Sequence, residues 1–361
     1  MTRQSTSKVY FVDIDGKRDD GVLSRLERLC LAAGLSDVVD PGDVVAVKLH
    51  FGELGNTRML RPQFLKVIVR LIKEQGALPF LTDCNTLFYR NRYNAVLHLE
   101  TAWFNGYDHA GMGAPVIVAD GLRGLDYRRV RYRADLLEVK VGAAIYEADK
   151  LVTVTHFKGH DQSGFGGIIK NLGMGAIARS GKLALHSASK PTIDRARCHG
   201  CGACLEVCAW QAIRRDREGL FVEAESCAVC GNCVAVCSRK AIDFAWDMDI
   251  MDFQKRLVES CAAVLANKQG RAFYVSFLVD ITAFCDCRSW SPLPLVGDIG
   301  ILAGCDPVSV EQASLDFVEQ KIKEVHGNKT LSDFTGVDGE LMLTYAEQLG
   351  LGSRRYELVP V

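Results

Sequence analysis

Eight cysteines in two runs carry the most specific chemical signal in the chain. Each run has the spacing C-x2-C-x2-C-x3-C, and the second repeats the first at a constant offset: Cys198, Cys201, Cys204 and Cys208, then Cys227, Cys230, Cys233 and Cys237. The dipeptide Ala212-Ile213 recurs at the same offset as Ala241-Ile242. In proteins with two [4Fe–4S] clusters, three thiolates of one run bind one cluster and the fourth binds the other. The segment is therefore predicted to be a duplicated cluster-binding unit.

This rule divides the eight cysteines into two ligand sets. We predict Cys198, Cys201, Cys204 and Cys237 for one cluster, and Cys227, Cys230, Cys233 and Cys208 for the other. Gly202 and Gly231 stand between ligands, where the backbone must turn tightly. A pair of structural zinc sites is the alternative, but zinc sites do not need two offset runs of four. Residues 194–245 resemble bacterial-type ferredoxins, although Ala209 and Ser238 stand where those proteins usually have proline.

Composition describes an ordinary globular protein. The chain has 361 residues, is 48% hydrophobic and 24% charged, and carries a net charge of −1, which gives no indication of nucleic acid or an anionic membrane. No apolar segment follows Met1–Lys8, and no apolar run approaches the length of a membrane span. We expect a soluble cytoplasmic protein. Its fourteen cysteines then indicate metal binding or redox chemistry, since disulfides are rare in a reducing compartment.

Outside the cysteine runs, strand-like and helix-like segments alternate. We expect strands at Val9–Ile14, Val44–His50, Leu78–Thr82, Val116–Ala119, Leu151–Thr155, Phe273–Val279 and Tyr356–Val359. Helices are expected at about Leu23–Ala33, from Pro62 onward, at Phe253–Ala266, from Asp306-Pro307 to about Val325, and at Leu341–Leu349. The predicted fold is α/β, a mostly parallel doubly wound sheet with an inserted α+β ferredoxin-like domain. The predicted boundaries are 1–190, 191–247 and 248–361.

Ionisable side chains stand at the carboxyl ends of the predicted strands. They are Lys48, His50, Asp83, Asp120, His156 and Asp280. Each alone has an ordinary explanation, because strand ends are exposed and Asp favours turns. Ligands of open α/β sheets bind at this edge, so together these residues predict a pocket there.

Two loops add candidate ligands. His156-Phe157-Lys158-Gly159-His160 has two histidines and a lysine suited to a metal or an anion, unless both histidines are simply exposed. Then Ser163–Gly167 forms a glycine-rich turn that opens a helix, which predicts free N–H groups for an anion. The turn matches neither the Rossmann nor the Walker pattern, so an ordinary dinucleotide or ATP site is disfavoured.

Cys285-Asp286-Cys287 follows a predicted strand, and two thiols at i and i+2 can point the same way. Metal or cluster ligation, a redox-active thiol and chance all remain open. With His156 or His160 the two cysteines would form a mixed nitrogen and sulfur site, a candidate third metal centre. Cys30 and Cys261 lie among apolar residues and are expected in the core.

Several stretches together resemble the ferredoxin-containing members of the domain-of-unknown-function-362 family. They are Lys48–Glu53, Thr82-Asp83, Asp120-Gly121, His156–His160, Gly164–Asn171, Gly173–Gly175, Cys198–Cys237, Cys285–Cys287, Asp298–Gly300 and Asp306-Pro307. The resemblance implies an iron–sulfur protein with an α/β domain of undefined activity. Cys84 departs from the threonine-like residue that the family leads us to expect.

Three functions fit these features. The first is an oxidoreductase in which the clusters relay electrons to the strand ends, with His50, Asp83, His156, Lys158, His160 and Lys170 as candidate catalytic residues. Lys158 and Lys170 would bind a small anionic substrate, and a histidine would supply protons. The second is an electron carrier or metallocofactor-assembly helper for a partner enzyme. The third is a structural or oxygen-sensing role. The first two predict a redox partner protein, and exposed clusters predict sensitivity to oxygen.

Overall fold

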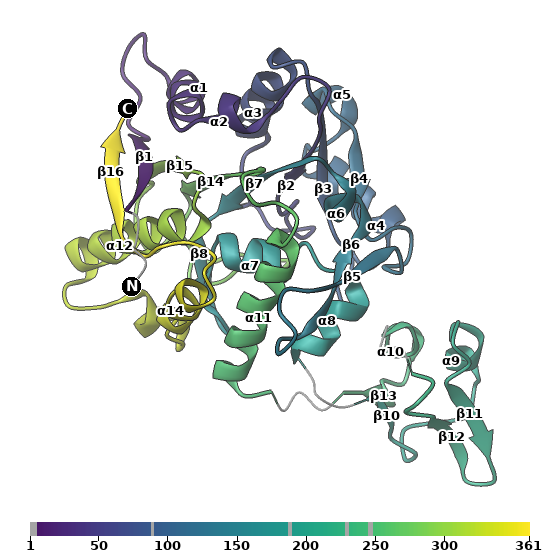
Figure 1. Cartoon of the computed structure of the whole chain (residues 1–361). Coiled ribbons are helices and arrows are strands. Elements are labelled where there is room, and N and C mark those ends of the chain that lie inside the picture. Colours follow the sequence, from purple (N-terminus) through teal and green to yellow (C-terminus); the bar gives the residue numbers. More distant parts are fainter. Residues whose placement is uncertain (1–5, 88–89, 187–189, 228–230, 245–247) are drawn as a thin grey trace.

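A computed structural model of the chain describes residues 6–87, 90–186, 190–227, 231–244 and 248–361. Its centre is an eight-stranded sheet with the order β16-β1-β15-β14-β7-β2-β3-β4. These strands are β1 (Ser7–Asp13), β2 (Val44–Lys48), β3 (Leu78–Asp83), β4 (Val116–Val118), β7 (Lys150–His156), β14 (Ala272–Leu278), β15 (Gly300–Gly304) and β16 (Tyr356–Pro360). Figure 1 shows the sheet with helices above and below it.

Helices cover both faces of the sheet, as predicted for a doubly wound fold. One face carries α1 (Val22–Ala32), α2 (Leu35–Val38), α3 (Pro62–Glu74) and α5 (His109–Met112). The other carries α6 (Ala143–Glu147), α7 (Ile168–Gly173), α8 (Arg179–His186), α11 (Ile250–Leu265), α12 (Pro307–His326), α13 (Leu331–Thr335) and α14 (Glu340–Gln348). The helix α4 (Ala95–Phe104) lies beside the edge strand β4.

Side chains along each strand point alternately to the two faces of the sheet, and each face packs against its helices to form a separate hydrophobic core. In β2, Val45 and Val47 pack with α1 and α3, whereas Ala46 between them faces the opposite core. The periodicity of α3 buries Phe64, Val67, Ile68 and Leu71, as predicted.

The parallel part of the sheet fixes where a ligand site can lie. Adjacent strands β14, β7, β2, β3 and β4 run parallel, so their carboxyl ends meet at one edge. One strand of the eight-stranded sheet was not predicted: β15 runs antiparallel between β1 and β14. The α/β class and the mostly parallel sheet are thus confirmed, with β15 as the antiparallel exception.

Two hairpins and the cysteine-rich segment complete the chain. The hairpins are β5 (Tyr127–Arg131) with β6 (Glu138–Gly142), and β8 (Lys158–His160) with β9 (Gly164–Gly166). The cysteine-rich segment holds β10 (Thr192–Ile193), α9 (Ala203–Glu206), β11 (Ile213–Asp216), β12 (Gly219–Val222), α10 (Asn232–Val236) and β13 (Ile242–Asp243). β10 pairs with β13, so the two ends of the segment meet, and Figure 1 shows it projecting from the sheet domain.

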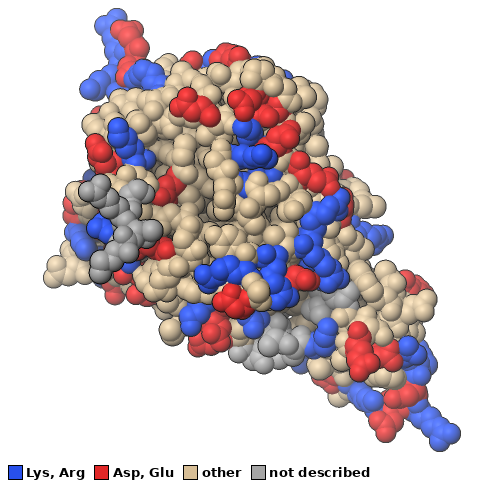
Figure 2. Space-filling view, viewed as in Figure 1, with Lys and Arg blue, Asp and Glu red and all other residues tan. Residues whose placement is uncertain are grey.

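Surface charge differs between these two parts. Figure 2 shows acidic and basic side chains mixed over the projecting segment, whereas Lys and Arg gather on the adjoining face of the sheet domain. Among the described residues, no helix is long and apolar enough to cross a membrane.

Candidate functional site

A cavity of about 370 Å³ opens at the carboxyl ends of the parallel strands. All six predicted catalytic residues and both cysteines of the Cys285-Asp286-Cys287 turn line it: His50, Asp83, His156, Lys158, His160, Lys170, Cys285 and Cys287. These residues come from β2, β3, β7, the β8 hairpin, α7 and the loop after β14. Sequence reasoning from strand ends therefore located the pocket.

Three of the predicted strand-end residues lie elsewhere. Lys48 is buried beneath the cavity, where its Nζ lies 3.1 Å from Asp83 Oδ1 and donates to Asn171 Oδ1 at 2.6 Å. Asp120 accepts hydrogen bonds from the backbone N–H groups of Asn85 and Arg179. Asp280 pairs on the surface with Arg58 and Arg61. The expectation that Asp120 and Asp280 share the pocket is therefore wrong, because local backbone and surface partners hold them.

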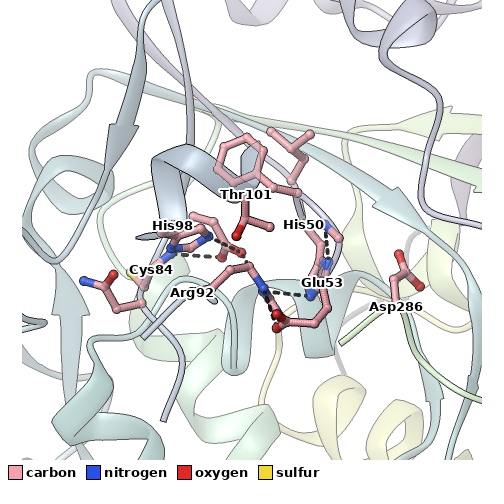
Figure 3. Close-up of polar contacts among 12 residues, drawn as sticks. His50, Glu53, Cys84, Arg92, His98, Thr101 and Asp286 are labelled. Carbon is pink, nitrogen blue, oxygen red and sulfur yellow. Dashed lines mark hydrogen bonds and ion pairs between the residues drawn. The ribbon is translucent and has the colours of Figure 1, made fainter. Parts of the chain in front are cut away.

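A buried network that sequence reasoning missed forms one wall of the cavity (Figure 3). Arg92 pairs with Glu53 at 3.1 Å, and its NH1 also lies 3.1 Å from His50 Nε2. The backbone N–H of Gly52 donates to His50 Nδ1. Burial, followed by the charge of Arg92, holds the pKa of His50 well below its usual range, so this ring is neutral.

Asp83 stays ionised in this wall although it is buried. Burial alone would raise the pKa of the carboxyl, but Lys48 and then His98 hold the pKa below its usual range. His98 lies 3.8 Å from Asp83, and burial lowers the pKa of its ring to about 3. One signal for this network was present in the sequence: Glu53 belongs to the stretch Lys48–Glu53 that resembles the family. Arg92 and His98 were missed because neither residue lies at the end of a predicted strand.

Asp286, the middle residue of the Cys285–Cys287 turn, pairs with two buried side chains of other segments. Its Oδ2 lies 3.0 Å from His156 Nδ1, and its Oδ1 lies 3.2 Å from Lys158 Nζ. His156 Nε2 faces the carbonyl of Val279 at 2.7 Å. His156 is thus engaged by protein groups, which leaves His160 as the histidine beside the cysteines.

Three metal-ligand atoms lie together at the centre of the cavity. One ring nitrogen of His160 and the sulfurs of Cys285 and Cys287 are within 4.8 Å of one another. The predicted third site therefore has the spacing of a metal centre. Lys170 Nζ contacts Cys285 Sγ at 3.2 Å, so a cation already lies against one sulfur.

The two thiols are coupled to each other and to this lysine. A hydrogen bond from Cys287, and then the charges of Lys170 and Lys158, hold the pKa of Cys285 well below its usual range. The same bond raises the pKa of Cys287. The two opposite shifts have one cause, in which Cys285 is the sulfur that accepts from the thiol of Cys287.

The histidine has a defined hydrogen position. The backbone N–H groups of Gln162 and Ser163 donate to His160 Nδ1 at 3.1 and 3.2 Å. Burial, followed by Lys170, lowers the pKa of this ring well below its usual range. A neutral ring that accepts at Nδ1 carries its hydrogen on Nε2.

The glycine-rich turn does not offer free N–H groups to an anion, contrary to the sequence expectation. At the start of α7, the N–H groups of Ile168 and Ile169 donate to the carboxylate of Glu311. Burial raises the pKa of Glu311 to about 8. The chain's own carboxyl therefore occupies the predicted anion site.

The described thiols of the cysteine-rich segment lie in two groups that combine cysteines of both runs. Burial raises the pKa of Cys204, and the thiols of Cys198, Cys201 and Cys237 around it raise it further. Cys208 lines a small cavity together with Cys227 and Cys233. Cys230 lies outside the described residues. Each fourth cysteine thus lies beside cysteines of the other run.

The internal repeat is visible in the backbone. Ala212 and Ala241 each donate an N–H to the sulfur of the fourth cysteine of their own run at 3.2 Å. The residues before them, Gln211 and Lys240, both have left-handed backbones with φ of 50° and 51°. The two halves therefore share the same turn and the same N–H to sulfur contact after their fourth cysteine.

The family model described as "Domain of unknown function (DUF362)" matches residues 45–316, more than half of the chain. The chain belongs to this family. The match spans the cavity, the cysteine-rich segment and the Cys285–Cys287 turn. No curated protein matches the chain.

Two solved structures share a distant likeness with the chain. The lactate racemase apoprotein from Thermoanaerobacterium thermosaccharolyticum has 12% identity and a TM-score of 0.42, covering 82% of this chain and 55% of that one. A protein from Thermotoga maritima has 11% identity and a TM-score of 0.39, covering 87% of this chain and 60% of that one. The chain thus spans little more than half the length of each. Likenesses at these scores carry no inference about activity.

Proposed function

We propose that the protein is an iron–sulfur redox protein that relays electrons from two [4Fe–4S] clusters to the polar cavity of its α/β domain. Cys198, Cys201, Cys204 and Cys237 would hold one cluster, and Cys227, Cys230, Cys233 and Cys208 the other. Such clusters supply electrons one at a time. The grouping of the described thiols into these two sets supports the proposal.

The contact between the second cysteine run and the cavity wall carries the proposal. Gly231, between Cys230 and Cys233, lies against the sheet domain: a Cβ at this position would be in ordinary van der Waals contact with Leu87 Cδ1 at 3.5 Å and Arg179 NH2 at 3.7 Å. Leu87 lines the cavity. Lys190 also donates from Nζ to the backbone carbonyl of Cys227 at 2.9 Å. The cluster of the second run would therefore lie on the cavity side, and the first on the far side.

The far side suits an external electron donor. Cys201 of the first run is exposed, whereas Cys204 and Cys233 are buried. A one-electron donor protein would thus deliver to the first run, and the second run would pass electrons toward Leu87. The cavity would then bind a small anionic substrate through Lys158, Lys170 and their neighbours.

The alternative is a carrier or cofactor-assembly helper without catalysis of its own. The coupled thiols of Cys285 and Cys287 favour it if they hold a metal that a partner removes. That function predicts a labile third metal and a stable complex with a partner enzyme.

Iron and acid-labile sulfide analysis of anaerobically purified protein tests the proposal, together with electron paramagnetic resonance after reduction with dithionite. We expect about eight iron and eight sulfide per chain, and two interacting reducible clusters. Zinc in place of iron, or clusters that no reductant reaches, would refute the relay. In the latter case the clusters would serve structure or sensing.

A further inference from the structure

We propose that Cys285 and Cys287 form a redox-active pair that cycles between dithiol and disulfide and reduces a small anionic disulfide bound in the cavity. This rests on the proposed function in one respect, because the clusters return the electrons. The pair is the only described group of the cavity wall able to exchange two electrons without a further cofactor.

The turn holds the two sulfurs as a pair. The backbone N–H of Arg288 donates to the carbonyl of Cys285 at 3.1 Å, which closes a tight turn around Asp286. Asp286 is tied to His156 and Lys158 and does not itself line the cavity. Both cysteines line the cavity, and their sulfurs lie within 4.8 Å of each other.

The surrounding charges favour thiol chemistry over a divalent metal. Lys170 contacts Cys285 at 3.2 Å and would lie beside any metal bound to that sulfur. The hydrogen on Nε2 of His160 makes that nitrogen a donor rather than a ligand, since Gln162 and Ser163 hold Nδ1. A metal-ligating histidine usually binds the metal through one ring nitrogen and donates a hydrogen bond from the other, whereas Nδ1 of His160 accepts. Two sulfurs then remain, fewer than the three protein ligands of a typical catalytic zinc site.

The lining of the cavity selects the charge of the substrate. Six cationic side chains face it: Arg90, Arg92, Lys158, Lys170, Lys182 and Arg288. Three lining carboxylates oppose them, Glu53, Asp83 and Asp161, and Asp286 next to the cavity pairs with Lys158, so the cations still outnumber the carboxylates. A disulfide that carries carboxylates would therefore be favoured over one that carries ammonium groups.

The exchange balances in two steps. A thiolate of the pair attacks one sulfur of the substrate disulfide, forms a mixed disulfide and releases one substrate thiolate, which takes the proton of the pair's other cysteine. That second cysteine, now a thiolate, attacks the mixed disulfide, releases the other half of the substrate as a thiolate and closes the Cys285–Cys287 disulfide. Two electrons and one proton then restore the reduced pair of one thiolate and one thiol. The electrons come singly through the clusters from the donor protein.

A single peptide reports the state of the pair. Cleavage after Arg271 and Arg288 releases residues 272–288, which contain Cys285, Cys287 and no other cysteine. The disulfide form of this peptide is two hydrogens lighter than the dithiol. Full-length anaerobic protein is treated with dithiodiglycolate, an anionic disulfide, or with cystamine, a cationic disulfide of similar size, then acid-quenched and analysed by mass spectrometry.

We expect dithiodiglycolate to oxidise the pair at least tenfold faster than cystamine, and Lys170→Met to reduce that preference. Cys305→Ser, which changes an exposed cysteine outside the cavity, should leave the rates unchanged. No disulfide in peptide 272–288 with either probe would overturn the proposal. So would a stoichiometric non-cluster metal that disappears in Cys285→Ser/Cys287→Ser, because the pair would then be a metal site.

A second experiment tests the redox pair separately from the proposed electron relay through the clusters. Oxidised protein is reduced with dithionite-reduced donor ferredoxin, with wild type compared against Cys204→Ser/Cys233→Ser, which removes a ligand from each cluster. Recovery of the dithiol in wild type alone supports both ideas. Oxidation by dithiodiglycolate with equal recovery in the two proteins retains the redox pair and refutes the relay.

Discussion

Lys48 and Asp83, at the ends of the neighbouring strands β2 and β3, form an ion pair of 3.1 Å whose two side chains are 0% and 3% exposed. Asp83 lines the cavity in the same wall as His50 and Arg92, and Lys48 is buried behind it. A buried pair of this kind adds little to stability compared with apolar residues, yet removing one partner leaves an uncompensated charge.

Lys48→Met is therefore expected to lower the free energy of unfolding by about 3–5 kcal/mol. The reason is that Asp83 loses its nearest cation and stays buried. The double variant Lys48→Met/Asp83→Leu should recover part of this loss. Anaerobic urea unfolding measures all three proteins.

An exposed ion pair gives the control. Lys321 and Glu324 lie one turn apart on α12 with side chains 41% and 48% exposed, so Lys321→Met should cost less than about 1 kcal/mol. Equal losses for Lys48→Met and Lys321→Met would show that burial does not distinguish the two pairs.

If the fourth cysteine of each run binds the cluster of the other run, cysteine variants should give matching resonance spectra in predictable pairs. Cys237→Ser should lose the cluster of the first run and give the same resonance spectrum as Cys204→Ser, because both thiols surround one centre. Cys208→Ser should instead match Cys233→Ser, since these two line the other centre. Each variant should retain about four iron per chain.

The pairing of spectra is the decisive comparison. If Cys237→Ser resembles Cys233→Ser, each run binds its own cluster with all four cysteines. A gross loss of folding would affect every variant alike, so the spectra of the remaining cluster distinguish the two arrangements.

Much of this fold follows from local patterns. The contiguous apolar runs of β2, β3 and β7 predicted buried parallel strands, and Asp306 does cap α12 by accepting from Val308 and Ser309. β15 was missed because Gly300–Gly304 is short and bounded by glycines, and its place depends on pairing with β1 and β14. A strand defined by distant partners leaves little local signal.

The candidate site, like the fold, was predicted in part from the sequence. Residues at strand ends were found because parallel strands bring those ends to one edge. Arg92 and Glu311 were missed, because each acts on a partner far along the chain: Arg92 on His50 and Glu311 on the start of α7. Nor does the sequence show that His156 is engaged by Asp286 while His160 stays beside the thiols.

Glu311 gives the protein a predictable pH dependence. Its pKa is about 8 in the folded chain against an ordinary value of 4.5, so the folded state keeps a proton that the unfolded state releases. The free energy of unfolding should then fall as pH rises from about 4.5 to 8, by at most about 1.4 kcal/mol per pH unit, and level off above. Glu311→Gln should flatten this slope, because the amide oxygen still accepts from α7 without titrating.

The control lies on the same helix. Glu324 is exposed and pairs with Lys321, which lowers its pKa, so Glu324→Gln should leave the slope between pH 4.5 and 8 unchanged. Urea unfolding at several pH values measures the slopes. A wild-type slope that survives in Glu311→Gln would assign the titration to another buried group.

Asp286→Asn tests whether the anchor beneath the cysteine turn positions the two thiols. The variant removes the carboxylate that faces His156 and Lys158, and an amide accepts at only one of the two positions. We expect a loss of about 3 kcal/mol in the free energy of unfolding. We also expect faster alkylation of Cys285 and Cys287 by iodoacetamide, because the turn then opens more often.

Asp161→Asn is the matched comparison at the same cavity. Asp161 pairs with Arg288 while 39% exposed, so its loss should cost less than about 1 kcal/mol and leave the alkylation rate of peptide 272–288 unchanged. If Asp286→Asn destabilises the protein without changing that rate, the anchor serves the fold alone. Faster alkylation in Asp286→Asn only would show that the buried triad of Asp286, His156 and Lys158 holds the two sulfurs in place.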